Sequence, residues 1–272
     1  MLLTADIGNT NITLGLFERD EYINEFRLPS DRDLEQCEYE NLLKSIFKDY
    51  SIDGCVIGSV VTELDEKFKN AVKNVFGLEP VVVSNKINCG VKIVADEPEE
   101  VGADRIANAS AVAKMNIGAV IVVDFGTATT FDIVNSKKEF CGGIIIPGLK
   151  TQLKSLYNTT SKLPQIEMDF SPVAVAQNTK DAILAGVIRG CACAVDGLVE
   201  QCEKELNEKV KLIATGGYSG LMANYLKRKF DYVNPILTLE GLKYIYELNS
   251  NDITLKHKEP KYAKSKYDRS NS

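Results

Sequence analysis

The sequence contains no tryptophan and only one histidine, His257, which lies near its C-terminal end. A folded body without histidine excludes Ser–His–Asp triads, Cys–His dyads and HExxH zinc sites. No apolar run approaches the roughly 20 residues that span a bilayer. No basic segment followed by a cleavable apolar one precedes the first strand. We therefore expect neither a membrane span nor a secretory signal.

The seven cysteines are odd in number and scattered among apolar residues. This distribution favours buried thiols in a reducing cytoplasm over a disulfide framework. Cys191 and Cys193 are two apart in a helical pattern, so they should face different sides of the helix and not chelate a metal. The net charge of −6 argues against binding to nucleic acid or an anionic membrane. Residues 251–272 are basic and polar, which predicts a disordered tail; the alternative is a nucleic-acid-binding arm.

The order of strand and helix patterns repeats along the chain. Each half reads as a strand hairpin, a third strand, a helix, a strand and a helix. In the first half the strands fall at residues 2–6, 12–17, 21–28, 54–60 and 80–84, and the helices at 33–50, 64–76 and 102–115. In the second half the strands fall at 119–124, 127–134, 141–146 and 210–215, and the helices at 147–157 and 179–206. A glycine turn and helix follow within 216–226, and a final helix at 238–249. The pattern predicts two similar α/β domains, residues 1–117 and 118–250, with a ligand-binding cleft between them.

The first strand of each half ends in a similar turn. Asp6 and Gly8 are followed by small polar residues, and Asp124 and Gly126 recur 118 residues later (124 − 6). The same offset pairs Asn9 with Thr127 and Asn11 with Thr129. Backbone N–H groups of such a turn can bind an anion, and an aspartate beside a phosphate requires a cation between them. The repeat therefore predicts a site for nucleotide phosphates with a metal ion, although a single Asp–Gly turn is also common in plain hairpins.

Five motifs occur in a fixed order along the chain. They are DIGNTN from Asp6, GADR at residues 102–105, DFGTATTFD at 124–132, GGIIIPGL at 142–149 and ATGG at 214–217. Together they resemble the type III pantothenate kinases, bacterial enzymes of the acetate/sugar kinase, Hsc70 and actin superfamily. The resemblance spans about residues 1–249. It implies an α/β fold with two ribonuclease H-like (actin-like ATPase) domains.

The resemblance also implies an activity and its site. The reaction would be phosphorylation of pantothenate by ATP to 4′-phosphopantothenate, the first step of coenzyme A synthesis. Asp104 would accept the proton of the substrate hydroxyl, Asp6 would lie near Mg²⁺, and Asp124 would bind K⁺ or NH₄⁺. The residues implied to bind ATP are Asp6, Ile7, Gly8, Asn9, Thr10, Asn11, Ile12, Thr13 and Thr127. Those implied to bind pantothenate are Gly102, Ala103, Asp104, Arg105 and Thr179.

The resemblance further implies a cytoplasmic homodimer with the substrate pocket near its interface. One departure stands out: Ala95 occupies the place where the family usually has a tyrosine that packs on pantothenate. Without the resemblance, Asp104 and Arg105 could equally form an exposed ion pair at a helix start. Two other functions stay open, a non-catalytic transcription accessory factor on the same fold and another kinase or phosphatase of the superfamily.

Overall fold

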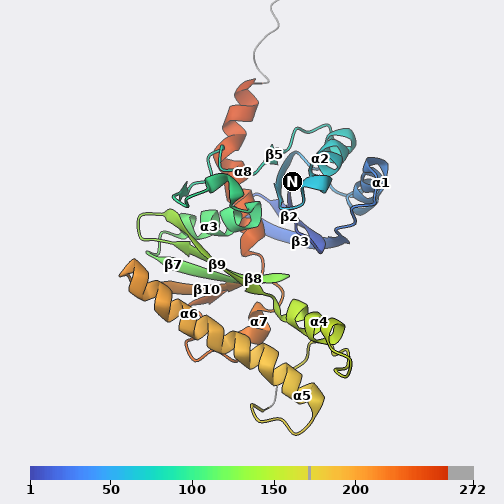
Figure 1. Ribbon diagram of the computed structural model, residues 1–272. Coiled ribbons are helices and arrows are strands. Elements are labelled where there is room, and N and C mark those ends of the chain that lie inside the picture. Colours follow the sequence, from blue (N-terminus) through green and yellow to red (C-terminus); the bar gives the residue numbers. More distant parts are fainter. Residues whose placement is uncertain (171–172, 257–272) are drawn as a thin grey trace, which may run out of the picture.

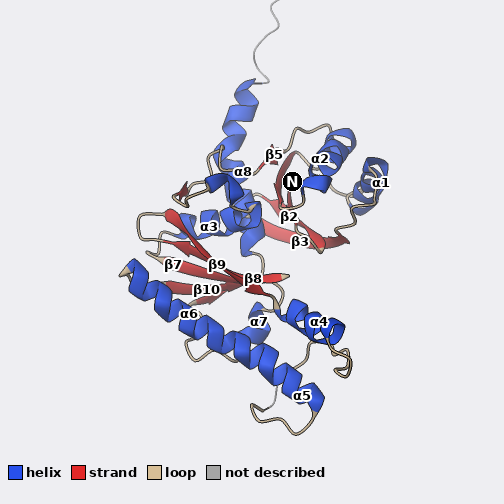
Figure 2. Cartoon of the chain, in the orientation of Figure 1, coloured by secondary structure: helices blue, strands red, loops and turns tan. Residues whose placement is uncertain are grey.

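The chain is described by a computed structural model that covers residues 1–170 and 173–256. It contains two β-sheets with helices on their faces, stacked one above the other in Figure 1 and coloured by secondary structure in Figure 2. The first sheet has the order β3-β2-β1-β4-β5. Its strands are β1 (Leu2–Ile7), β2 (Asn11–Glu18), β3 (Glu21–Pro29), β4 (Gly54–Ser59) and β5 (Val81–Val82).

The second sheet repeats the first. Its order is β11-β10-β7-β8-β9-β6, so β7, β8, β9, β10 and β11 stand where β1, β2, β3, β4 and β5 stand in the first sheet. The strands are β6 (Lys92–Ile93), β7 (Val120–Phe125), β8 (Ala128–Val134), β9 (Glu139–Pro147), β10 (Lys211–Thr215) and β11 (Tyr232–Val233). In both sheets the first strand pairs antiparallel with the second and parallel with the fourth. The predicted repeat is confirmed.

The turn that follows the first strand differs in length between the two copies. Asp6 pairs with Thr13 across the first hairpin, whereas Asp124 pairs with Thr130 across the second. The first turn is closed by a hydrogen bond from Gly8 N to the oxygen of residue 11, and the second by one from Gly126 N to the oxygen of residue 128. The second turn is therefore one residue shorter, and the predicted pairing of Asn11 with Thr129 is wrong by one position.

The helices cover both sheets and fill the space between them. They are α1 (Gln36–Ile46), α2 (Thr62–Phe76), the 3₁₀ turn η1 (Pro98–Glu100), α3 (Ala103–Met115), α4 (Leu149–Thr159), α5 (Thr179–Leu184), the π-helical η2 (Ala185–Arg189), α6 (Gly190–Leu206), α7 (Ser219–Met222) and α8 (Leu237–Lys256). Helices α1 and α2 pack on one face of the first sheet, and α4 to α7 pack on one face of the second. The remaining faces of both sheets pack against α3, which places this helix between them.

Two segments cross between the sheets. Strand β6 precedes the predicted boundary at residue 117 but pairs with β9 in the second sheet. Helix α8 follows the second sheet in sequence but packs against α3 and the first sheet. The boundary at residue 117 stays a prediction. Helix α8 continues to Lys256, so the first six residues of the predicted tail are helical, because no proline interrupts the pattern before Pro260. Residues 257–272, with His257, lie outside the described residues.

One long helix, Thr179–Leu206, combines α5, η2 and α6. Among the described residues it alone is long and apolar enough to cross a membrane by length and composition, with a mean hydropathy of 1.8 over its most apolar window. The predicted absence of an apolar run of about 20 residues is a different criterion, because Arg189 and Asp196 interrupt this helix. Half of that window is buried, and residues such as Val187 and Val195 pack on the second sheet. Cys191 is buried and Cys193 exposed, as the helical spacing predicted, and all seven cysteines are free.

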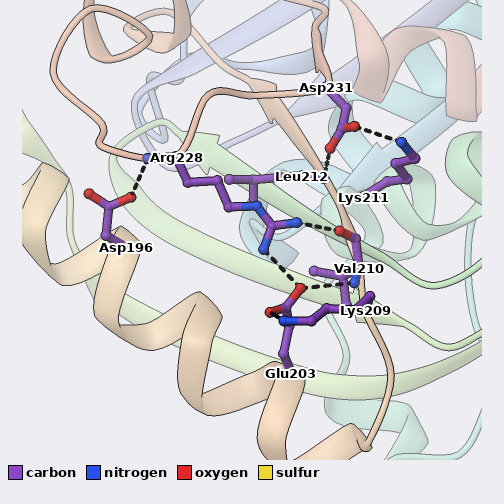
Figure 3. A network of polar contacts seen from close by, with 8 residues as sticks. All are labelled: Asp196, Glu203, Lys209, Val210, Lys211, Leu212, Arg228 and Asp231. Carbon is purple, nitrogen blue, oxygen red and sulfur yellow. Dashed lines mark hydrogen bonds and ion pairs between the residues drawn. The ribbon is translucent and has the colours of Figure 1, made fainter.

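A polar network joins α6 to β10 at the edge of the second core (Figure 3). Glu203 is 8% exposed and accepts hydrogen bonds from Lys209 Nζ and Arg228 Nη1, both at 2.8 Å, and from the Val210 N–H at 3.1 Å. Burial alone would raise the pKa of Glu203, but these three donors outweigh it and lower the pKa to about 2. Ionised Glu203 therefore stabilises the folded state.

Replacing Glu203 by glutamine should destabilise the fold in a pH-dependent way. The pKa of an unfolded glutamate is about 4.3, so the folded-state pKa is the lower one. The stabilisation should be present above roughly pH 5 and be lost as the pH falls toward 2. We expect Glu203→Gln to lower the free energy of unfolding by about 1–3 kcal/mol at pH 7, measured by urea denaturation.

The matched control is Glu200→Gln on the same helix, which removes an exposed pair with Lys204 and should change stability far less. An equal loss in both variants, or a Glu203→Gln effect that stays constant down to pH 3, would contradict this role.

Candidate functional site

Four aspartates converge around the start of α3. Asp6 lies near the end of β1, Asp124 near the end of β7, Asp132 on β8, and Asp104 in the first turn of α3. Asp132 is completely buried, whereas the other three are only partly exposed. The first strand of each sheet thus delivers one carboxylate, β8 of the second sheet adds the buried Asp132, and the helix between the sheets adds Asp104.

Burial first, and neighbouring carboxylates for Asp6 and Asp124, raise the pKa values of these groups. Burial raises the pKa of Asp6 well above its usual value, and the charges of Asp104 and Asp124 raise it further. Burial, together with Asp132 and Asp104, raises the pKa of Asp124 to about 7. Burial also raises the pKa of Asp104, against the opposing effect of its hydrogen bond from the Arg105 N–H. A cation in this space would relieve the repulsion.

The two glycine turns meet directly. The hydroxyl oxygens of Thr10 and Thr127 lie 3.0 Å apart, which joins the turn after β1 to the turn after β7. Both residues are exposed, so the contact lies at the surface of the site. Arg32 Nη2 donates a hydrogen bond of 3.2 Å to Asn9 Oδ1, which adds a guanidinium beside the first turn. The two turns predicted to bind one polyphosphate therefore adjoin one another.

Arg105 pairs with Asp132, not with its neighbour Asp104. Its Nε donates to Asp132 Oδ1 at 2.6 Å, and its Nη2 donates to the Phe131 carbonyl oxygen at 3.1 Å. The guanidinium carbon lies 5.3 Å from the centre of the Phe140 ring. The alternative of a simple exposed Asp104–Arg105 ion pair is therefore wrong, because the side chain turns inward onto the second sheet.

The turn after β10 also touches the site. Gly216 has a φ of +83°, and a Cβ there would lie 2.3 Å from Asp124 Oδ1. Only glycine allows the chain to pass this close to the carboxylate. Gly216 of the ATGG motif is therefore required by its packing against Asp124, whereas a Cβ at Gly217 would meet no atom within 4 Å.

The donor set suits cations that are shared with a substrate. Within residues 1–170 and 173–256, no three His, Cys, Asp or Glu side chains gather in a way that could hold a metal alone. Mg²⁺ is commonly bound by one or two carboxylates together with substrate phosphates, which fits Asp6. Thr215 lies opposite Asp124 in the parallel pairing of β10 and β7, and its hydroxyl is buried without a hydrogen-bond partner. The carboxylate of Asp124 and the unbonded hydroxyl oxygen of Thr215 are suitable ligands for a monovalent cation.

The structure gathers most, but not all, of the predicted site residues. Ile7 and Ile12 are fully buried in the core beneath α1 and α2, so only their backbone groups can reach a ligand. Ala103 is likewise buried, and Gly102 caps α3 beside Asp104. Ala95 is half-buried and packs on the core between α3 and the second sheet.

Thr179 lies apart from the other predicted substrate residues. It begins α5, on the face of the second sheet opposite α3, and lines a cavity of about 890 Å³. The cavity also touches Thr151, whose hydroxyl donates to the Thr127 carbonyl oxygen at 2.7 Å. Within a single chain, Thr179 therefore lies near the turn after β7, through the cavity that it shares with Thr151, and away from Asp104.

Three residues of the site had no role assigned from the sequence. They are Asn108, Asp132 and Thr238, which are linked by hydrogen bonds. Asn108 follows Asp104 by four residues, so helical spacing could have placed it on the same face. Asp132 stands within the DFGTATTFD motif. Nothing near Thr238 in the sequence points to the site.

Solved structures share the arrangement of the two domains. A crystal structure of the ethanolamine utilization protein EutJ from Carboxydothermus hydrogenoformans matches with a TM-score of 0.55 and 15% identity, covering 89% of each chain. A ROK family transcriptional regulator, a homologue of the E. coli MLC protein, matches with a TM-score of 0.54 and 12% identity, covering 94% of this chain and 80% of the other. At such identities the likeness shows the fold alone, and it confirms the predicted fold class of two ribonuclease H-like domains.

Sequence relatives are much closer. A type III pantothenate kinase from Geotalea daltonii is 41% identical over 254 residues, which make up 92% of this chain and 99% of the relative. Another from Dehalococcoides mccartyi is 40% identical and covers 91% of this chain and 96% of its own length. The family model described as type III pantothenate kinase matches residues 2–201. With this coverage and the converging aspartates of its two repeated turns, the chain belongs to the type III pantothenate kinase family.

Proposed function

We propose that this protein transfers the γ-phosphoryl group of ATP to the primary hydroxyl of pantothenate, the first step of coenzyme A synthesis, in the cytoplasm. The observation that carries the proposal is the meeting of the two duplicated turns beside Asp104 within a chain of this family. The turns supply backbone N–H groups and hydroxyls for the phosphates. Phosphoryl transfer depends mainly on such positioning and on charge neutralisation.

Asp104 is the proposed general base. It is partly exposed at the N-terminal end of α3, where a hydroxyl substrate can approach it. Burial raises its pKa, which makes the ionised carboxylate a better proton acceptor than a fully solvated one. Asp104 would orient the hydroxyl and accept its proton as the bond to phosphorus forms.

Arg105 is the proposed anchor for the carboxylate of pantothenate. Five N–H groups are available on a guanidinium, and the structure gives partners to two of them, on Nε and Nη2. The remaining groups can bind an anionic substrate. The buried Asp132 fixes the orientation of the guanidinium, so this binding surface is already formed before the substrate arrives.

Two cations complete the proposed site. Mg²⁺ would be held near Asp6 with the phosphates of ATP, and K⁺ or NH₄⁺ would be held at Asp124 near Thr215. They would supply positive charge that neutralises the transferring phosphoryl group. The protein residues themselves bind the phosphates, hold Arg105 and position Asp104.

A homodimer is the proposed assembly. Thr179 and Asp104 lie on opposite faces of the second sheet within one chain. If Thr179 contacts the substrate, a second copy must bring it there, beside the cavity between α4 and α5. This separation supports a substrate pocket at a dimer interface.

The alternatives make different predictions for one assay. Purified protein is incubated with ATP, Mg²⁺ and either K⁺ or NH₄⁺, and ADP release is measured with and without pantothenate. A pantothenate kinase releases ADP only with pantothenate. A non-catalytic regulator releases none, and another kinase of the superfamily responds to a sugar instead. Absence of pantothenate-dependent turnover with both cations would reject the assignment.

Asp104→Asn should abolish most turnover without weakening ATP binding. The substitution keeps the shape of the side chain but removes the proton acceptor, so kcat should fall by about 10²–10⁴-fold. The dissociation constant for ATP, measured by calorimetry, should stay within about twofold. The control is Glu99→Gln, an exposed acid just before α3. A variant that retains most of its rate would show that Asp104 only orients the substrate.

Asp124→Asn should weaken the dependence on the monovalent cation. The neutral amide removes the charge that attracts K⁺, so the K⁺ concentration for half-maximal rate should rise at least tenfold, about 1.4 kcal/mol. Titrations with KCl would be compared with choline chloride at the same ionic strength. An unchanged K⁺ titration would remove Asp124 from the cation site.

A further inference from the structure

We propose that Asn108 is a positioning residue that couples the substrate-binding Arg105 to the cation ligand Asp124, and that Thr238 on α8 fixes its orientation. The inference rests on the proposed function and extends it to residues with no contact to substrate of their own. It follows from a continuous set of hydrogen bonds that runs from one side of the site to the other.

The side-chain amide of Asn108 lies between two carboxylates. Its Nδ2 donates to Asp132 Oδ2 at 3.0 Å and approaches Asp124 Oδ2 at 3.4 Å. Asn108 is 1% exposed and Asp132 is fully buried, so water cannot replace the hydrogen bond between them. An ionised carboxylate only accepts hydrogen bonds, and a single NH₂ group has two donors to offer. The amide of Asn108 is therefore a neutral side chain that can donate a hydrogen bond to each of the two aspartates at the same time.

Asp132 connects this amide to Arg105. One of its oxygens accepts from Arg105 Nε and the other from Asn108 Nδ2. Both oxygens of the carboxylate are thus held, and its plane is fixed. A shift of Asn108 toward or away from Asp124 would move Asp132 and, through it, the guanidinium that we expect to bind pantothenate.

Thr238 determines which way the amide points. Its hydroxyl donates to Asn108 Oδ1 at 2.8 Å, which leaves the NH₂ group facing the two carboxylates. Helix α8 reaches α3 this closely because of Gly241, where a Cβ would lie only 1.9 Å from the Ala107 carbonyl oxygen. The close crossing of the two helices therefore brings the Thr238 hydroxyl to Asn108, although the two residues are 130 positions apart in the sequence.

The functional consequence is an energetic link between two ligands. A cation bound at Asp124 would attract this carboxylate and weaken its hydrogen bond with Asn108 Nδ2. The strength of the hydrogen bond from Asn108 Nδ2 to Asp132 would change as a result. Substrate bound by Arg105 acts on the same bonds from the other end. By thermodynamic reciprocity, K⁺ should tighten pantothenate binding by the same factor as pantothenate tightens K⁺ binding.

The test measures this coupling factor directly. Pantothenate is titrated by calorimetry into the full-length protein with Mg²⁺ and a non-hydrolysable ATP analogue, with K⁺ or with choline. The coupling factor is the ratio of the two dissociation constants. We expect it to be about fivefold or more in the wild type. Asn108→Leu should reduce it to near one and weaken pantothenate binding by about tenfold.

A second pair of variants tests the orienting hydroxyl of Thr238 alone. Thr238→Val should lower the coupling factor, whereas Thr238→Ser should restore it, because serine keeps the donor. The matched control is Ser110→Ala on the same helix, which deletes a buried hydrogen bond of 2.6 Å to the Cys89 carbonyl oxygen away from the site. A merely structural role would make Ser110→Ala and Thr238→Val alike, with both leaving the coupling factor unchanged.

The outcomes separate the inference from the proposed function. If the wild type neither binds nor phosphorylates pantothenate, both fall. If it does both, and the coupling factor is unchanged in Asn108→Leu, the inference alone is overturned. If Asn108→Leu does not fold, the valine and serine variants of Thr238 decide, and equal coupling factors in these two overturn it.

Discussion

The concentration of negative charge around α3 is the constraint on which the rest of the site depends. Burial raises the pKa values of Asp6, Asp104 and Asp124, and the charge of Asp104 raises those of Asp6 and Asp124 further. Asp132 is fully buried. Like charges at this distance in a partly desolvated space are unfavourable. The fold tolerates them because Arg105 neutralises Asp132. The remaining three carboxylates face the space in which cations and phosphates are expected.

Duplication explains why two carboxylates meet, and divergence explains why only one sheet carries the coupling network. Across the hairpins, Thr4 pairs with Gly15 and Val122 pairs with Asp132, so Gly15 is the counterpart of Asp132. A Cβ at Gly15 would lie 2.9 Å from Leu239 on α8. In the first sheet, glycine at this position allows α8 to pack closely. In the second sheet, the aspartate at the same position, Asp132, binds Arg105.

The sequence allowed the repeat, the hairpins and the helix start at Asp104 to be predicted, because each depends on local pattern. Turn glycines, alternating strands and the helical spacing of α3 are all visible within short windows. The hydrogen bond from Thr238 to Asn108 is not, since it depends on the crossing of two helices far apart in the chain. The glycine turn and helix predicted within residues 216–226 are present, but the helix is short, Ser219–Met222, with Met222 and Leu226 buried in the second core.

Charge balance is the physical argument for the cations that the proposed function includes. A triphosphate brings several negative charges to a space already lined by Asp6, Asp104 and Asp124. The described contacts place one guanidinium, that of Arg105, within this cluster, and Asp132 already neutralises it. Arg32 lies outside, beside Asn9. Under the proposed function, cations that arrive with ATP would offset this repulsion, and the carboxylate near the end of each duplicated strand would be available to bind them.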